Sequence, residues 1–278
     1  PQPFEDALAA ENFPRVEELW LEALDRDPIP TTELFEVRRR LWQVGPKALA
    51  RTLLELLADA LEVGGPPSDA LAAVRELVRL TDKPSAAMIE RLEKAVAAAR
   101  SDSPSLAAVL ARFHLTEARH PLDVLEDMER WLDHDIGTVV EVQGQGVGRV
   151  VDVNLELENL KVDIGGRKPV SVPIGAVNRF LRRLPEGDFL RRKVEDLSGL
   201  TAFVAGDPPE ALAQLLSSLG QPVEVAAIKA ALEGVLPPSS WTTWWNKARK
   251  HPRVITSGSG SRLKYEVTHS AEAATDSL

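Results

Sequence analysis

The hydrophobic period of the chain changes at Gly137, and this change divides the sequence into two kinds of structure. Upstream, apolar residues such as Val16, Leu19 and Ala23 recur at three- and four-residue spacing, which is typical of one face of a helix. Downstream, Leu160, Val162 and Ile164 alternate with charged residues, which is the two-residue period of a half-buried strand. One helical part followed by a strand-rich part is therefore predicted.

Residues 1–133 are predicted to be helical throughout. Proline and glycine clusters, such as Pro28–Pro30 and Gly64–Pro67, separate apolar stripes long enough for paired helices. Helices of this length in antiparallel pairs indicate a tetratricopeptide-like repeat, although the units do not align residue for residue. An irregular helical bundle is the alternative, and in both cases this half is interpreted as a scaffold.

Residues 134–184 are predicted to form a small β-barrel. Short β-branched runs alternate here with turn residues, and the pair Gly165–Gly166 suits a tight hairpin because glycine adopts positive φ without a clash. Four or five strands in so short a segment favour a closed or nearly closed barrel. Residues 185–206 are expected to connect this barrel to the next domain.

Residues 207–269 are predicted to form a winged helix, and residues 270–278 a flexible tail. The run Asp207–Glu210 has the capping aspartate, proline and glutamate of a strong helix start. Two more short helices follow, then the strands Val254–Ser257 and Ser261–Val267, which is the order of a winged helix. The predicted fold class is α+β, mainly α: a helical-repeat half, a barrel and a winged helix.

Composition excludes several classes of function. The chain has no cysteine, which excludes disulfides, thiol catalysis and cysteine-based zinc sites. Its formal net charge of −9 argues against wrapping the whole molecule in nucleic acid, although the charge is unevenly distributed. The apolar runs are too short to span a bilayer, so we expect a cytoplasmic protein without a membrane partner.

The glycine-rich run Gly144–Gly148 has the spacing of a dinucleotide-binding loop, but a strand follows it instead of a helix. A pyrophosphate site needs a helix N-terminus at that point, so we interpret the glycines as a turn and expect no cofactor. The five histidines show no metal-ligand spacing, and no acid, base and nucleophile can be assembled. We therefore expect no catalytic residue, no metal and no enzyme activity.

Basic residues gather at the C-terminal end, where the predicted third helix and hairpin carry one acid, Glu266. A wing with basic side chains on its exposed face is typical of contact with phosphates or an acidic protein; the alternative is a solvated surface. The residues expected to make such contacts are Arg149, Arg167 and Lys168 at the barrel, and Lys247, Arg249, Lys250, Arg253, Arg262 and Lys264 at the C-terminal end. At least two of Trp241, Trp244 and Trp245 are expected in the core, because they share a helical spacing.

Two motifs are unusual enough to suggest a family. The helix Ser240–Lys250, with its Trp-x-x-Trp-Trp core, is the sharpest, and the strand Gly146–Asn154 is moderately specific. Both resemble the extended N-terminal region of the long Gre-type (GreA/GreB-like) bacterial transcription elongation factors. The resemblance covers nearly the whole chain. Its other parts are Phe4–Leu8, Leu19–Trp20, Asp135–Val140, Leu184–Leu190 and Ala227–Lys229. The barrel is also similar to the Tudor-like, polymerase-interacting modules of CarD-type proteins.

The resemblance implies association with bacterial RNA polymerase or its nucleic acid. Gre factors act through a coiled-coil hairpin with an acidic tip, and this sequence has no such heptad hairpin, so stimulation of transcript cleavage is not expected of it. Either that domain has been removed or the chain is a stand-alone relative. The leading hypothesis is a non-catalytic transcription-associated adaptor that binds polymerase, DNA or RNA. The alternatives are an independent DNA-binding regulator with a helical dimerisation domain and a purely structural scaffold.

Overall fold

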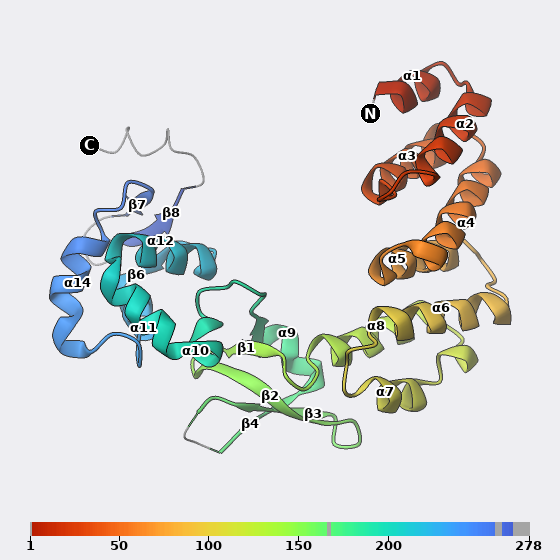
Figure 1. The fold of residues 1–278 in the computed structure, drawn as a ribbon. Coiled ribbons are helices and arrows are strands. Elements are labelled where there is room, and N and C mark those ends of the chain that lie inside the picture. The colour runs from red at the N-terminus through yellow and green to blue at the C-terminus, as the bar shows by residue number, and fades with distance from the viewer. Residues whose placement is uncertain (1, 166–167, 259–262, 269–278) are drawn as a thin grey trace. The chain divides into compact units, whose positions relative to one another are not determined.

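The computed structural model describes residues 2–165, 168–258 and 263–268. The chain is mainly helical, with two small antiparallel sheets, and divides into two compact units, residues 1–133 and 134–278 (Figure 1). The division falls four residues before Gly137, close to where the hydrophobic period changes.

The first unit contains eight α-helices in its described residues. Seven of them bury an apolar stripe, whereas α7 buries only Val109; in α4, for example, Leu53 and Leu57 are fully buried and Leu61 almost so. The helices are α1 (Gln2–Ala9), α2 (Phe13–Leu24), α3 (Thr31–Val44), α4 (Lys47–Gly64), α5 (Pro67–Arg79), α6 (Ala86–Ala99), α7 (Leu106–Phe113) and α8 (Pro121–Asp133). A short 3-10 turn, η1 (Leu115–Glu117), precedes α8.

Arginine–carboxylate pairs connect helices of the first unit that are not neighbours in sequence. Arg38 of α3 meets Glu76 of α5 at 2.8 Å, and Arg91 of α6 meets Asp59 of α4 at 2.6 Å. Arg40 of α3 also pairs with Glu5 of α1. Such pairs between alternate helices occur where helices stack in series. That the helices form tetratricopeptide-like repeats stays a prediction.

The second unit begins with a five-stranded antiparallel sheet. Its strands are β1 (Val139–Val142), β2 (Gly146–Asn154), β3 (Asn159–Asp163), β4 (Val170–Pro173) and β5 (Leu181–Arg183), in the order β4-β3-β2-β1-β5. The predicted alternation is confirmed in β3, where Leu160 and Val162 are fully buried and Lys161 is exposed. A short helix, α9 (Val177–Phe180), leads from β4 into β5. Closure of this sheet into a barrel stays a prediction.

The glycine-rich run forms the turn between β1 and β2. Gly144 and Gly146 have φ of 72° and 117°, where a side chain would be strained, and the chain continues into β2 rather than into a helix. A Cβ on Gly148 would clash with the backbone carbonyl of Asp163 on β3. These glycines are therefore required by the sheet itself.

The segment 185–206, which the sequence predicts as a connection, is helical and packed. It contains α10 (Arg192–Glu195) and α11 (Leu197–Gly206). Leu200 and Val204 of α11 are fully buried in the same core as Leu212 of the next helix, and Val139 of β1 belongs to this core as well. The sheet and the C-terminal helices of the second unit therefore share one hydrophobic core.

The C-terminal helices and hairpin follow in the order expected for a winged helix. They are α12 (Pro208–Leu219), α13 (Val225–Ala231), α14 (Trp241–Ala248), β7 (Val254–Ser257) and β8 (Lys264–Val267). Asp207 accepts from the N–H of Glu210 at 3.2 Å, and Gly220 ends α12 with φ of 66°, as the sequence predicts. A two-residue strand, β6 (Val223–Glu224), pairs with β8, giving a second sheet in the order β6-β8-β7.

Candidate nucleic-acid interface

Helix α14 has two chemically different faces. Trp244 and Ala248 are buried in the core of the second unit, and Trp241 and Trp245 are half-buried against it. The remaining positions are all exposed, and none is acidic. They are Thr242, Thr243, Asn246 and Lys247, followed by Arg249 and Lys250 directly after the helix.

The tryptophan face of α14 is held by ring contacts and one hydrogen bond. Trp241 stacks on Trp245 with ring centroids 5.5 Å apart and planes at 13°, and Trp245 meets Tyr265 of β8 edge-on at 5.0 Å. Trp244 donates its indole N–H to the backbone carbonyl of Val204 at 2.7 Å. Because the tryptophans fix the helix by its inner side, the polar and basic side faces outward.

Lys229 was not among the predicted contact residues, but it lies beside the same helix. Its side chain is exposed on α13, and its ammonium lies 5.9 Å from the ring centroid of Trp241, in cation–π geometry. Its signal in the sequence is weak, because one lysine in an alanine-rich helix has no pattern. The structure therefore extends the basic surface of α14 towards α13.

The predicted cations of the hairpin have different environments. Lys264 is exposed on β8, opposite Glu224 in the register of β6. Arg253 lies 3.7 Å from Glu210 of α12, which also contacts His251 at 3.2 Å, so its charge is partly engaged within the protein. Arg262 lies outside the described residues. Lys247, Arg249 and Lys250 are exposed at the end of α14. Lys264 is exposed on the neighbouring sheet.

The predicted cations of the first sheet form a separate group. Arg149 of β2 is half-buried and donates to the carbonyl of Gly137 at 3.0 Å, so it supports the start of β1. Lys168, between β3 and β4, is exposed, and Arg167 lies outside the described residues. In Figure 1, β3 and β4 lie at the opposite end of the second unit from the β7–β8 hairpin. The predicted residues therefore do not form one continuous site.

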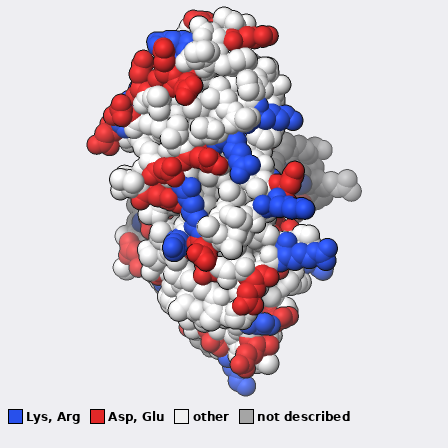
Figure 2. Space-filling model, turned by 90° about the vertical axis from the view of Figure 1, so that its right-hand side faces the viewer, with Lys and Arg blue, Asp and Glu red and all other residues white. Residues whose placement is uncertain are grey.

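Charge is divided unequally between the two units. Residues 1–133 have 16 Lys and Arg against 25 Asp and Glu, a net charge of −9, whereas residues 134–278 have 17 of each, a net charge of zero. Figure 2 shows acidic and basic side chains mixed over one face, with a group of acidic ones at its upper left. The whole negative balance thus belongs to the helical unit, and the basic α14 surface belongs to a neutral one.

A second basic run, from Arg179 to Lys193, is largely used inside the second unit. Arg182 of β5 bonds to Glu141 of β1 at 2.8 Å and to the carbonyl of Ser218 in α12 at 2.7 Å. Arg191 bonds to Glu195 at 2.8 Å. These arginines connect elements of the fold, so they are not counted here as nucleic-acid contacts.

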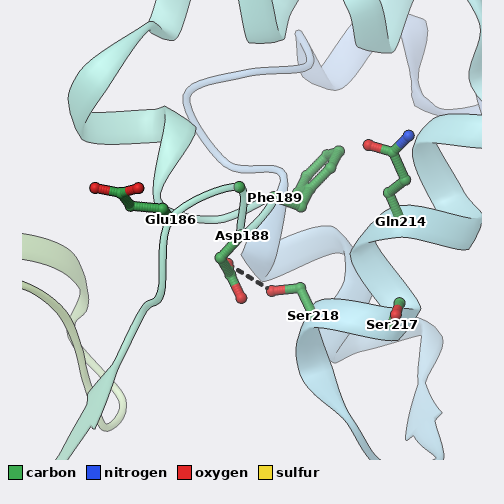
Figure 3. Close-up of a pocket in the computed structure, with 7 residues that line it drawn as sticks. Glu186, Asp188, Phe189, Gln214, Ser217 and Ser218 are labelled. Atoms are coloured by element: carbon green, nitrogen blue, oxygen red, sulfur yellow. Dashed lines mark hydrogen bonds between the residues drawn. The ribbon is translucent and has the colours of Figure 1, made fainter. Parts of the chain in front are cut away.

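An open polar pocket of about 480 Å³ lies between the loop 186–189 and α12 (Figure 3). Its central contact is the hydroxyl of Ser218, which donates to Asp188 Oδ1 at 2.8 Å; the same oxygen accepts from the N–H of Leu190. Asp188 is thereby fully engaged in joining the loop to the helix. The pocket is interpreted as a structural joint.

The described part of the chain has neither a metal-binding cluster nor a helix that could span a membrane. No group of three or more His, Asp or Glu side chains is arranged to hold a metal ion. No described helix has the length and apolarity required to cross a lipid bilayer.

Comparisons with known proteins agree with the C-terminal geometry. Residues 190–255 match the GRAD helix-turn-helix domain family, a range that runs from two residues before α10 into β7. The match begins upstream of Asp207, in agreement with the burial of α11 in the same core. A helix-turn-helix with α14 as its last helix is therefore present at this end of the chain.

Two curated relatives are similar to part of the chain. The transcription elongation factor GreA of Chlamydia pneumoniae is 30% identical over 119 residues, which is 41% of this chain and 16% of that protein. GreA of Chlamydia trachomatis serovar D is 29% identical over 122 residues, 42% of this chain and 17% of that protein. No solved structure matches. The similarity to Gre factors is partial, and the chain spans less than a fifth of the length of these relatives.

Proposed function

We propose that this chain is a non-catalytic, transcription-associated adaptor whose helix-turn-helix binds duplex nucleic acid through the exposed face of α14. The observation that carries the proposal is the acid-free polar and basic face of that helix, from Thr242 to Lys250, on a core-anchored scaffold. In helix-turn-helix proteins the second helix of the motif enters the major groove, and its exposed side chains contact base edges and phosphates.

The chemistry of the face suits both kinds of contact. Asn246 has an amide that can pair with the edge of adenine, and Thr243 lies near the N-terminal end of the helix, which approaches the bases most closely. Lys247 and Lys250 are exposed cations suited to phosphates. The hairpin β7–β8 adds Lys264, in the position of a wing beside the duplex.

The association with transcription is supported by the similarity to GreA, and contact with bacterial RNA polymerase is part of the proposal. The five-stranded sheet is the surface proposed for polymerase, because its edge strands β4 and β5 each have one sheet neighbour among the described residues. The helical unit would supply a further protein-docking surface.

DNA binding is tested by fluorescence anisotropy of the full chain with duplex DNA over a series of salt concentrations. The double variant K247E/K250E should weaken binding at least tenfold and lower the slope of log affinity against log salt by about 2, since each phosphate contact contributes about 0.9. The matched control is K83E/K94E, two exposed lysines of the helical unit, which should bind like the wild type. Equal affinity of both double variants would contradict the assignment of α14.

Polymerase binding is tested by interferometry with bacterial core RNA polymerase at two salt concentrations, with a Gre factor as the positive control. Saturable binding supports the adaptor and justifies mapping the sheet against α14. If the chain binds duplex DNA and not polymerase, the independent DNA-binding regulator becomes the better proposal. If neither is bound, the chain is a structural scaffold.

A further inference from the structure

A groove of about 760 Å³ lies within the second unit, separate from α14 and the β7–β8 hairpin. One wall is the turn between β1 and β2 with α9, and the other is α13. Its lining on α13 is formed by small side chains, Ala227, Ala230 and Ala231, whereas the lining residues Leu190 and Val223 are buried in the core behind it. Ala227 and Ala230 are exposed, so this apolar wall has no partner among the described residues.

The groove contains a lysine without a carboxylate partner. Lys193 donates from Nζ to the carbonyl of Ala231 at 3.0 Å and forms no ion pair with the described residues. Burial lowers the pKa of Lys193, and only the longer-range charges of Glu233 and Glu141 oppose this effect. An ammonium held by one backbone carbonyl in a partly desolvated wall is a site where an added carboxylate gains a charge-assisted hydrogen bond.

The rim of the groove carries a second cation and an exposed aromatic ring. The guanidinium of Arg179 lies 5.1 Å from the ring centroid of Phe180, whose exposed fraction is 39%. Arg179 is exposed and also forms no ion pair with described residues. Arginine is enriched among the residues that dominate binding energy at protein interfaces, and the exposed ring beside it adds apolar surface to the rim.

The acidic residues of the groove do not cancel these cations. Glu141 is paired with Arg182, which bonds to it at 2.8 Å and also lies 4.0 Å from Asp188, outside the lining. Glu233 is the other carboxylate of the described lining. The cations Arg179, Arg182 and Lys193 thus face two carboxylates, beside an apolar wall, and this positive balance favours an occupant that carries both negative charge and an apolar side chain.

We propose that the groove binds an acidic peptide segment of a protein partner, with an apolar side chain against the alanines of α13 and a carboxylate at Lys193 and Arg179. This docking site is distinct from the nucleic-acid surface, because no residue of α14, β7 or β8 lines the groove. It gives the chain a second point of attachment that is specific for protein.

The probe is a random peptide display library, selected on the immobilised full chain. Sequences that pair Asp or Glu with a large apolar residue should be enriched, and a synthetic fluorescein-labelled copy of the most enriched peptide should bind the chain saturably. Replacing its acidic residues with Asn or Gln should weaken binding at least tenfold. Enrichment without acidic residues, or no enrichment above the bare support, would overturn the proposal.

Two exposed positions of the groove supply variants that leave the core intact. Ala230→Glu places a carboxylate in the groove, and Arg179→Glu reverses the charge at the rim. Each should lower the affinity for the labelled peptide at least tenfold. The control is Ala226→Glu, an exposed alanine of the same helix that does not line the groove, which should stay within twofold of the wild type. Equal effects of Ala230→Glu and Ala226→Glu would overturn the site.

Other occupants give different outcomes with the same variants. If Ala230→Glu lowers the affinity for a labelled single-stranded oligonucleotide and leaves peptide binding unchanged, the groove binds nucleic acid. If sedimentation shows a dimer that Ala230→Glu dissociates, the occupant is a second copy of the chain. Either result replaces the peptide proposal, and duplex-DNA binding through α14 is measured independently of it.

Discussion

Trp244 of α14 donates its indole N–H to the backbone carbonyl of Val204 in α11, at 2.7 Å inside the core. In a continuing helix that carbonyl would accept from the residue four positions later, which is Pro208 and has no N–H. The neighbouring carbonyl, of Phe203, has its bond from Asp207 at 2.9 Å. Trp244 therefore satisfies a group that the proline leaves without a donor, and it attaches the last helix of the motif to α11.

Trp244→Phe should destabilise the C-terminal helices by about 1 to 3 kcal/mol, because it leaves the carbonyl of Val204 buried without a donor. The measurement is native-state hydrogen exchange of the full chain, read at the amides of α11, α12 and α14, where the free energy of opening should fall. Trp241→Phe is the control. Because the Trp241 ring is only half-buried, this variant should lower the free energy of opening by less than Trp244→Phe does. Equal losses in both variants would contradict this role of Trp244.

The tryptophan pattern illustrates what the sequence can predict. The spacing of Trp241, Trp244 and Trp245 predicted a helix with at least two rings in the core. The structure confirms the helix, but it buries only Trp244 and leaves Trp241 and Trp245 half-buried against the core. The bond to Val204 was not predictable, because it depends on a residue 40 positions away. Periodicity reports which side of an element is apolar; it does not report which partner meets it.

The limits are clearest for short elements and for single charges. Strand β6 has two residues, too few for an alternation to be recognised, and α11 is so uniformly apolar that it shows little amphipathic pattern. Arg149 was predicted as a contact residue from charge and position, and its bond to Gly137 follows from a sheet geometry that the sequence does not encode locally. The exposure of Lys247, Arg249 and Lys250 agrees with the sequence interpretation; their contacts stay predictions.

Arg182 joins the two parts of the second unit, and its replacement should loosen that joint. Its side chain bonds to Glu141 of β1 and to Ser218 of α12. Arg182→Ala should cost about 2 kcal/mol, because bonds of charged groups are worth more than neutral ones and two acceptors lose their donor. Arg182→Lys should recover part of the loss, since an ammonium lacks the planar fork that reaches both acceptors.

The loss at Arg182 is measured by hydrogen exchange at β1 and at the C-terminal end of α12, which should both open more easily. The control is Arg39→Ala, which removes an exposed pair with Glu36 one turn away and should leave the protection of β1 and α12 unchanged, because solvent screens such a pair. If β1 is protected from exchange equally in Arg182→Ala and in the wild type, Arg182 does not hold β1 against α12, and the prediction is wrong.

The pair of Arg38 and Glu76 makes a different prediction for the helical unit. The two side chains are 9% and 16% exposed and join α3 to α5 at 2.8 Å. Arg38→Ala leaves Glu76 with one partner, Arg79, and should destabilise the unit by about 2 to 4 kcal/mol, as for other broken buried pairs. The double variant R38M/E76L should recover most of this loss, because apolar residues of similar volume do not have to be desolvated as charges.

Circular dichroism at 222 nm during urea unfolding measures both variants, since residues 1–133 contain most of the described helix. The single variant should lower the midpoint of the helical transition, and the double variant should return it towards that of the wild type. A double variant less stable than Arg38→Ala would show that the pair is worth more than its desolvation cost, which contradicts the prediction.

Glu210 connects the first turn of α12 to the start of the hairpin, and its ionisation should make that connection sensitive to acid. The hydrogen bond from Gln214 lowers the pKa of Glu210 most, and His251 and Arg253 lower it further. A carboxylate whose pKa is lower in the folded state than its unfolded value of 4.5 stabilises the fold fully above that pH. The contribution is lost as the pH falls through the lower, folded pKa.

Glu210→Gln should therefore reduce the free energy of opening near neutral pH by about 0.5 to 1 kcal/mol, a modest value because the side chain is 36% exposed. The difference from the wild type should shrink towards zero as the pH falls below the folded pKa, where both side chains are neutral. Hydrogen exchange of β7 and α12 across this pH range measures it, and Glu90→Gln, on the exposed surface of α6, is the control. A difference that grows towards low pH would mean that Glu210 stabilises the fold in its protonated form, the reverse of what its contacts with His251 and Arg253 predict.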